Sequence, residues 1–320
     1  MKGKEIRIIS RALSQQALLG VLEDAGIFEQ EGLEPSVEVI RETAIADKKL
    51  MDGQADIIFG SHISPYRHLN VGIPFVCLAQ TVNYCTESIV ANFEIDSVKD
   101  VEGHRMALAP LYDATGRVAD HPRGNEQLIL DRAGVDMSRV DVVDFPESYY
   151  RFYEAIADGK AECAFLRSRH RPVVEAMGLK VLKVEPLPMV NSITITAFWP
   201  FVLGNEDTIR RLIRSLARGI HYFKNNRLGT LEVLRNRVAS KLALDDEEAI
   251  VALYESECRR NHEALFAKPD SIMNAFRLAC MGDQELDSTI NPMQLWDMSF
   301  VHELHRGGFY EELAKSETAS

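Results

Sequence analysis

Hydrophobic and polar residues alternate along the chain in short blocks that predict strands and helices in turn. Apolar runs at Ile6–Ile9 and Asp56–Phe59 predict buried strands, and the stretch Leu13–Ala25, stopped at Gly26, predicts a helix. Further strands are expected at Pro35–Ile40, Pro74–Gln80, Glu87–Asn92, Arg105–Ala109, Val181–Val184 and Ser192–Trp199. Strands that alternate with helices indicate an α/β fold with mixed, mostly parallel sheets.

The same pattern occurs twice in the sequence. Residues 21–60 and residues 129–166 each contain a helix end, Ala-Gly, an apolar strand, a helix and Asp-Gly, followed by another strand. The last strand starts with a small residue and an acid in both copies, Ala-Asp in the first and Ala-Glu in the second. Two equivalent α/β units predict two lobes with a cleft between them.

The extended segments on either side of the second copy predict where the chain crosses between the lobes. We expect lobe one to comprise residues 1–88 and 195–320, and lobe two to comprise residues 89–194, with the two crossings forming a hinge. After Asn205 the spacing predicts a helical C-terminal region, in which the expected helices are Thr208–Asn225, Leu228–Leu242, Asp246–Phe266 and Asn291–His305.

Four stretches carry a resemblance to a known family: MDGQADIIFG, IADGKAECAFL, VKDVEGHRMAL and TIRRLIRSLARGIHYFKNN. Over about residues 5–240 the chain resembles the type II periplasmic-binding-protein-like fold, in the branch similar to alkanesulfonate-binding and THI5/NMT1-like proteins. The resemblance implies two lobes and a small ligand, as in ABC-transporter substrate-binding proteins. The resemblance also implies an alternative function, that of an enzyme, because a few cytoplasmic enzymes have this fold. The chain lacks the cysteine-rich motif of the THI5 pyrimidine synthase, so that activity is not expected.

Composition and charge exclude some functional classes. A net charge of −12 without a basic run argues against a nucleic-acid partner. The five cysteines form no CxxC pair and are expected to be reduced thiols. The first twenty residues lack the apolar stretch of about 7–15 residues that a secretory signal needs, which predicts a cytoplasmic protein, or a periplasmic one if a leader has been removed. No membrane span is expected, and a homodimer is left open.

Ligands of such α/β lobes bind outside the carboxyl ends of the strands, so the loops at those ends supply the candidates. The candidate ligand-binding residues are Ser10, Arg11, Ser61, His62, Tyr66, His121, Arg123, Asn125, Arg167, His170 and Trp199. Among these, Arg11, Arg167 and Arg123 would clamp an anion, and Tyr66 and Trp199 would supply apolar walls.

Two of these loops allow a plainer interpretation. The five residues from Arg167 to Arg171 include four that can carry positive charge, which indicates either an anion site or a solvated helix start. Basic residues at a helix start oppose its dipole, and this mild penalty favours an anion site. In the other loop, Asn125 is better explained as a helix N-cap than as an anion ligand.

Three histidines, His62, His121 and His170, come from three such loops. They would form a metal site of catalytic type if they converged, or would donate hydrogen bonds to a carboxylate. No metal-binding spacing supports the first alternative, so we predict no metal, and the sequence identifies no cofactor. In an enzyme, His62 or His121 would be the catalytic acid or base.

The function expected from these observations is binding of a small anionic organic molecule between two lobes. We expect this molecule to carry a carboxylate group, and its body can be aromatic. The alternative is a cytoplasmic enzyme on the same fold, such as a decarboxylase or lyase that acts on an aromatic carboxylate.

Overall fold

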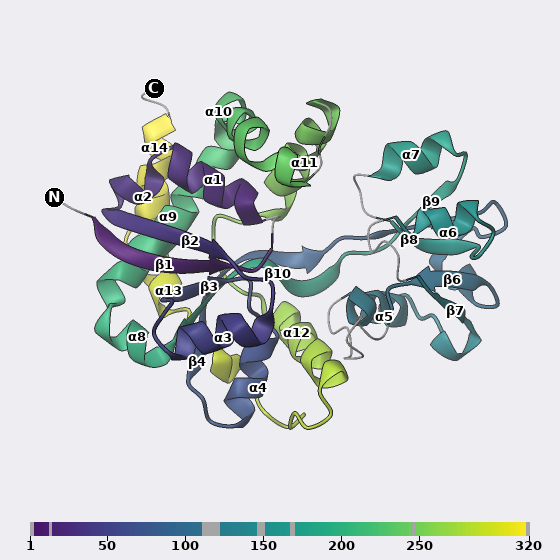
Figure 1. Ribbon diagram of the computed structural model, residues 1–320, viewed down its shortest axis with the longest axis horizontal. Coiled ribbons are helices and arrows are strands. Elements are labelled where there is room, and N and C mark those ends of the chain that lie inside the picture. Colours follow the sequence, from purple (N-terminus) through teal and green to yellow (C-terminus); the bar gives the residue numbers. More distant parts are fainter. Residues whose placement is uncertain are drawn as a thin grey trace. The chain divides into compact units, whose positions relative to one another are not determined.

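The chain folds into two compact units, each built around its own sheet (Figure 1). Unit 1 comprises residues 1–83, 190–273 and 289–320, and unit 2 comprises residues 84–189 and 274–288. The two-lobed α/β class expected from the sequence is confirmed. The computed structural model describes residues 3–12, 15–110, 122–145, 151–166, 170–242, 244 and 247–317.

The sheet of unit 1 has the strand order β2-β1-β3-β10-β4. Its strands are β1 (Lys4–Ser10), β2 (Leu33–Val39), β3 (Ile57–Phe59), β4 (Phe75–Cys85) and β10 (Leu187–Phe198). β1 runs parallel to β2 and β3, whereas β10 runs antiparallel to β3. The central strand β3 is fully buried, as a strand covered on both faces must be.

Helices cover both faces of the unit 1 sheet, with α1 and α2 on one side and α3 and α4 on the other (Figure 1). The helices of unit 1 are α1 (Gln16–Asp24), α2 (Ile27–Gln30), α3 (Thr43–Met51), α4 (Ser64–Asn70), α8 (Trp199–Gly204), α9 (Glu206–Asn225), α10 (Arg227–Val233), α11 (Glu247–Arg260), α13 (Ser299–Arg306) and α14 (Phe309–Glu317). A π-helical turn, Leu234–Val238, follows α10 and interrupts the long helix expected there.

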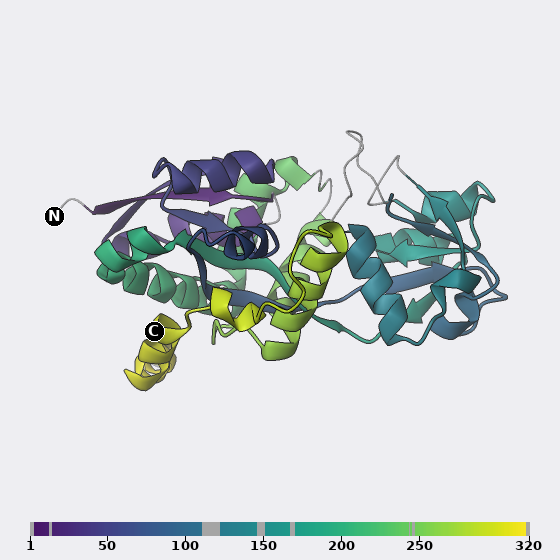
Figure 2. The ribbon, with the colours of Figure 1, turned by 90° about the horizontal axis from the view of Figure 1, so that it is seen from below.

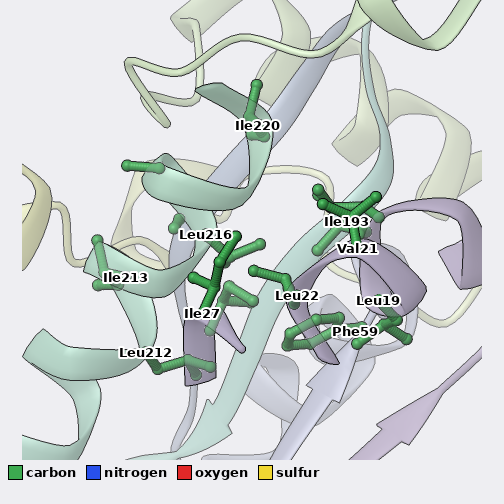
Figure 3. Packing of buried hydrophobic residues seen from close by; sticks show 14 of the residues in the cluster. Leu19, Val21, Leu22, Ile27, Phe59, Ile193, Leu212, Ile213, Leu216 and Ile220 are labelled. Carbon is green, nitrogen blue, oxygen red and sulfur yellow. The ribbon is translucent and has the colours of Figure 1, made fainter. Parts of the chain in front are cut away.

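An extensive core cluster lies between the sheet, α1 and the long helix α9. Apolar residues repeat along α9 at helical spacing, and Leu212, Leu216 and Ile220 are each at most 1% exposed. Leu22 of α1 and Phe59 of β3 belong to the same cluster, and Figure 3 draws their side chains together with those of α9. This cluster joins segments that are far apart in the sequence into one unit.

The C-terminal part of the chain returns to unit 1 and pairs with the edge strand β4. Cys77 forms a parallel bridge with Trp296, and the Asp297 N–H donates to the Cys77 carbonyl at 3.0 Å. The expected helix Asn291–His305 is confirmed only in its second half, because Pro292–Leu295 forms a 3-10 turn, the chain is extended at Trp296 and α13 begins at Ser299. Both termini belong to unit 1 (Figure 2).

The sheet of unit 2 has the strand order β7-β6-β8-β5-β9. Its strands are β5 (Ser88–Ala91), β6 (Arg105–Leu108), β7 (Asp141–Asp144), β8 (Cys163–Leu166) and β9 (Lys180–Lys183). Its helices are α5 (Pro122–Arg132), α6 (Tyr153–Ala157) and α7 (Arg171–Ala176), with short 3-10 turns at Val98–Val101 and Met137–Arg139. β6 pairs in parallel with β7 and β8, and β5 pairs antiparallel with β8 and β9.

One helix, α12 (Pro269–Gly282), has no counterpart in the elements expected from the sequence. The division between the units falls within it, and residues 274–288 belong to unit 2. The lobe boundaries expected from the sequence, with residues 195–320 in lobe one, stay a prediction.

Candidate functional site

The carboxyl ends of two parallel strands meet at one edge of the unit 1 sheet. In the register of β1 and β3, Ser10 lies beside Phe59, and the Arg11 N–H donates to the Phe59 carbonyl at 3.2 Å. The loops that follow these strands are therefore neighbours. We call the following residues of these loops and of the adjoining helix starts the strand-end site: Ser10, Arg11, Gln15, Ser61, His62 and Ser64.

The buried amide of Gln15 fixes the loop after β1 and links it to β10. Its Oε1 accepts hydrogen bonds from the Ser10 hydroxyl and the Arg11 N–H, both at 2.9 Å. Its Nε2 donates to the carbonyl of Ser192 at 3.3 Å. Gly60 makes room for this amide, because its φ is +99° and a Cβ there would lie 2.1 Å from Gln15 Nε2. The loop after β1 is thus fixed by one side chain that is 3% exposed and that packs against Gly60, the residue directly after β3.

Within the described residues, the guanidinium of Arg11 bonds only to neutral oxygens. Nη1 donates to Ser61 Oγ at 3.3 Å, and Nη2 donates to the Arg41 carbonyl at 2.5 Å and to Thr43 Oγ1 at 2.8 Å. Its Nε is buried and has no hydrogen-bond partner in this part of the chain. Burial lowers the pKa of Arg11 below its ordinary value, because the charged form has lost water.

Other arginines of unit 1 show the more usual arrangement. Arg7 Nη2 contacts Asp56 at 2.5 Å, and the buried carboxylate of Glu31 lies 2.7 Å from both Arg214 and Arg218. An arginine charge that is partly removed from water normally has a carboxylate partner. Arg11 therefore has bonding capacity for an anion that no described residue fills.

Buried hydroxyl and imidazole groups lie at the ends of β1 and β3, as Arg11 does. Ser10, Ser61, His62 and Ser64 are all less than a tenth exposed. The Ser64 hydroxyl has no hydrogen-bond partner among the residues that the structure describes. Serine hydroxyls and histidine N–H groups can donate to an oxyanion. The strand-end site therefore combines one positive charge with several neutral donors.

The two aromatic residues expected as apolar walls both pack into unit 1. Tyr66 is 0% exposed, and its hydroxyl accepts a hydrogen bond from Trp296 Nε1 at 3.3 Å. Burial raises the pKa of Tyr66. Trp199 is the first residue of α8 and packs, partly buried, against the main core cluster. Whether either residue contacts a ligand stays a prediction.

The candidate ligand-binding residues of unit 2 that the structure describes are Arg123, Asn125 and His170. Arg123 Nη1 donates to the Ala109 carbonyl at 2.6 Å and contacts Asp144 Oδ1 at 3.0 Å, so it already has a carboxylate partner. The N-cap interpretation of Asn125 is wrong, because α5 already begins at Pro122. His170 directly precedes α7, with its ring 5.4 Å from that of Tyr153.

Two candidates, His121 and Arg167, lie outside the described residues. Their expected roles therefore stay predictions, as does the meeting of the three histidines. Among the residues that the structure does describe, no group of three or more His, Cys, Asp or Glu side chains is placed to hold a metal ion. No helix of this part of the chain is long and apolar enough to cross a membrane.

Three residues near the strand-end site were missed from the sequence. Gln15 links the loop after β1 to β10, and Asp47 of α3 contacts His68 of α4, with 2.9 Å between Asp47 Oδ2 and His68 Nε2. Asp47 offered one signal, since it lies between Ala46 and Leu50 on the apolar side of its helix. A charged residue in that position is costly unless it has a partner.

Comparison with known proteins identifies relatives of the whole fold. A family model described as NMT1/THI5 like matches residues 15–227. Among curated protein sequences, none matches the chain significantly.

Several solved structures are similar to the chain along nearly its whole length. The periplasmic aliphatic sulphonate binding protein SsuA from Escherichia coli matches with a TM-score of 0.66 and 13% identity, covering 91% of this chain and 96% of that chain. The periplasmic sulfonate-binding protein SsuA from Methylobacillus flagellatus KT matches with a TM-score of 0.67 and 14% identity, covering 95% of each chain. The desulfurization enzyme DSZB matches with a TM-score of 0.62 and 13% identity, covering 94% of this chain and 99% of that chain. At these identities the matches establish a shared fold.

Proposed function

The chain belongs to the NMT1/THI5-like family, and on that premise we propose that it is a ligand-binding protein for a small anionic organic molecule. The observation that carries the proposal is the guanidinium of Arg11, partly buried and bonded within the described residues to neutral oxygens alone. A charge held in this way is stabilised when an oxyanion approaches it.

The strand-end site suits a carboxylate or a sulfonate group. Arg11 supplies the charge, and Ser61, His62 and Ser64 supply further donors from the neighbouring loop. The names of the two SsuA neighbours describe sulfonate binding on this fold, which supports an oxyanion ligand for this chain. The choice of a carboxylate, and of an aromatic body, is part of the proposal.

The proposal is tested by isothermal titration of the full chain with matched carboxylates and sulfonates: propionate, ethanesulfonate, benzoate and benzenesulfonate. We expect at least one to bind, and we expect Arg11→Gln to weaken that binding by about 10- to 100-fold. Arg41→Gln is the matched control, because the Arg41 side chain is exposed and only its carbonyl contacts the site. Equal binding by the Arg11 variant would remove this residue from the site.

The enzyme alternative has one structural neighbour in its favour, since DSZB is a desulfurization enzyme by name. In this chain the buried His62 would be the proton carrier. His62→Asn separates the functions: a binding protein should lose about 1–3 kcal/mol of affinity, whereas an enzyme should lose turnover by about 100-fold or more while binding survives. Product formation by the wild-type chain would decide for the enzyme.

The cellular location follows from the same proposal. The two SsuA neighbours are periplasmic by name, which supports the periplasmic alternative to the cytoplasmic location expected from the N-terminal residues. Fractionation of cells that express the complete native gene would test it, and protein found only in the cytoplasm would argue for the enzyme.

A further inference from the structure

A buried acid and a histidine lie one helical turn behind the strand-end site. α3 begins at Thr43, which Arg11 contacts, and Asp47 follows four residues later on the same side of that helix. α4 begins at Ser64, and His68 likewise follows four residues later. The two side chains meet, with His68 Nε2 2.9 Å from Asp47 Oδ2.

Asp47 acts on Arg11 through its charge and not through a bond. Its carboxylate is one of the two negative charges that raise the pKa of Arg11 against the larger, lowering effect of burial; the other is Glu42. Arg11 donates only to neutral oxygens, and Asp47 Oδ1 has no hydrogen-bond partner among the described residues. Asp47 therefore offsets the charge of Arg11 without fixing where its side chain lies.

The surroundings of His68 leave Asp47 as its main electrostatic partner. Its ring stacks on the uncharged ring of Phe75, with centroids 4.4 Å apart. Lys48, which follows Asp47 on α3, is exposed and bonds to Asp52. The other imidazole of this region, His62, belongs to the strand-end site itself. Imidazole is the side chain whose charge ordinarily changes between about pH 5 and 8.

We propose that Asp47 and His68 set how much positive charge Arg11 offers to an anion. When His68 is neutral, the charge of Asp47 offsets that of Arg11. When His68 is protonated, it neutralises Asp47, and Arg11 acts on the ligand at full charge. The inference rests on the proposed function, because it assumes that the anion binds at Arg11. By linkage, each proton bound at His68 then raises the affinity for an anion, so the affinity rises as the pH falls.

The test is the affinity of the full chain for ethanesulfonate and for benzoate, which are both anionic at about pH 5.5 and at about pH 8. We expect the wild-type chain to bind about 3- to 10-fold more tightly at the lower pH, as a single charge a short distance away would produce. Asp47→Asn should bind tightly at both pH values, and His68→Gln should bind weakly at both. Asp52→Asn, an exposed acid at the end of the same helix, should behave like the wild type.

Each contrary result has one meaning. Wild-type binding that is tight but independent of pH overturns the inference and leaves the proposed function standing. Weaker binding by Asp47→Asn would mean that Asp47 positions Arg11 and does not offset its charge. A pH dependence that persists in His68→Gln would assign the effect to His62. No wild-type binding at either pH overturns both proposals. If Asp47→Asn does not fold, as judged by circular dichroism, the wild-type and His68→Gln profiles decide the question.

Discussion

Unit 1 and unit 2 start a central strand with the same ion pair but hold it in different surroundings. In unit 1, Asp56 accepts hydrogen bonds from the backbone N–H and the guanidinium of Arg7 on the neighbouring strand. In unit 2, Glu162 does the same for Arg105. The side chain of Asp56 is 8% exposed, whereas that of Glu162 is 25% exposed. The sequence repeat therefore encodes the local bonding, and the elements packed over it decide the burial.

The residues that directly follow β1 in unit 1 and β6 in unit 2 show a second difference. In unit 1 the amide of Gln15 accepts a hydrogen bond from the N–H of Arg11, and in unit 2 the carboxylate of Glu126 accepts one from the N–H of Ala109, both at 2.9 Å. Both acceptors are buried. The equivalent position is therefore occupied by a neutral amide, Gln15, beside Arg11 in unit 1 and by a carboxylic acid, Glu126, in unit 2. The shared scaffold does not determine the charge at the strand ends.

The largest expected effect comes from removing the buried acid. Asp56→Ala should lower the free energy of unfolding by about 2–3 kcal/mol, because the Arg7 N–H loses its acceptor inside the protein. Glu162→Ala should cost less, because water reaches that site more easily. Thermal and urea unfolding measure both changes, with the exposed Asp158→Ala as the control. Equal losses from both units would contradict the role of burial.

Copying the acid of unit 2 into unit 1 tests the second difference. Gln15→Glu should weaken anion binding by about tenfold, because a carboxylate beside Arg11 offsets its charge and the donor to Ser192 is lost. Titration with benzoate and ethanesulfonate measures the change, and Gln30→Glu on the exposed surface is the control of equal charge. Unchanged affinity would show that the strand-end site does not bind the anion.

The two Asp-Gly turns should respond alike. Gly53 and Gly159 have φ values of +65° and +68°, and a Cβ on either would meet no atom within 4 Å. Replacement by alanine should therefore cost about 1 kcal/mol in each unit from backbone strain alone. Gly204 has equal space around it but no positive φ. Gly204→Ala should therefore change the free energy of unfolding by a few tenths of a kcal/mol at most. Unfolding curves of the three variants would reveal any difference between the units.

The smallest effect concerns one buried thiol in each unit. Burial raises the pKa of Cys77 and of Cys163 from 9.0 to about 12. Above pH 9 the unfolded chain loses these protons while the folded chain keeps them, so stability falls as the pH rises from about 9 to 12. Each thiol should contribute less than about 1 kcal/mol of this loss at pH 9.5. Cys77→Ala and Cys163→Ala should each reduce the fall in the free energy of unfolding above pH 9 by the same amount, as measured by urea unfolding at several pH values. A reduction in only one variant would argue against equal burial.

Much of the fold could be predicted because its signals are local. The strand at Ile6–Ile9, the helix that ends before Gly26 and the helix at Thr208–Asn225 are confirmed within a few residues. Hydrophobic periodicity and a glycine stop suffice for such elements. The segment at Trp296 was mistaken for helix because its extended shape depends on pairing with Cys77, a partner far away in the chain.

The candidate site was predictable only in part, for the same reason. Ser10, Arg11, Ser61 and His62 could be found, because each directly follows a predicted strand and parallel strand ends share an edge. Gln15 and the Asp47–His68 contact could not, because their roles rest on hydrogen bonds to other elements. No short-range pattern marks an amide that bonds to a carbonyl 177 positions away.

The place of β10 in the unit 1 sheet sets an order on synthesis at the ribosome. β10 lies between β3 and β4 in that sheet, yet it is made after the whole sheet of unit 2, which runs from Ser88 to Lys183. At about 5–20 residues per second, β3 and β4 wait on the order of ten seconds for the strand that joins them. During that interval the nascent N-terminal segment exposes unpaired strand edges, which are open to chaperones and to misassembly with neighbouring chains.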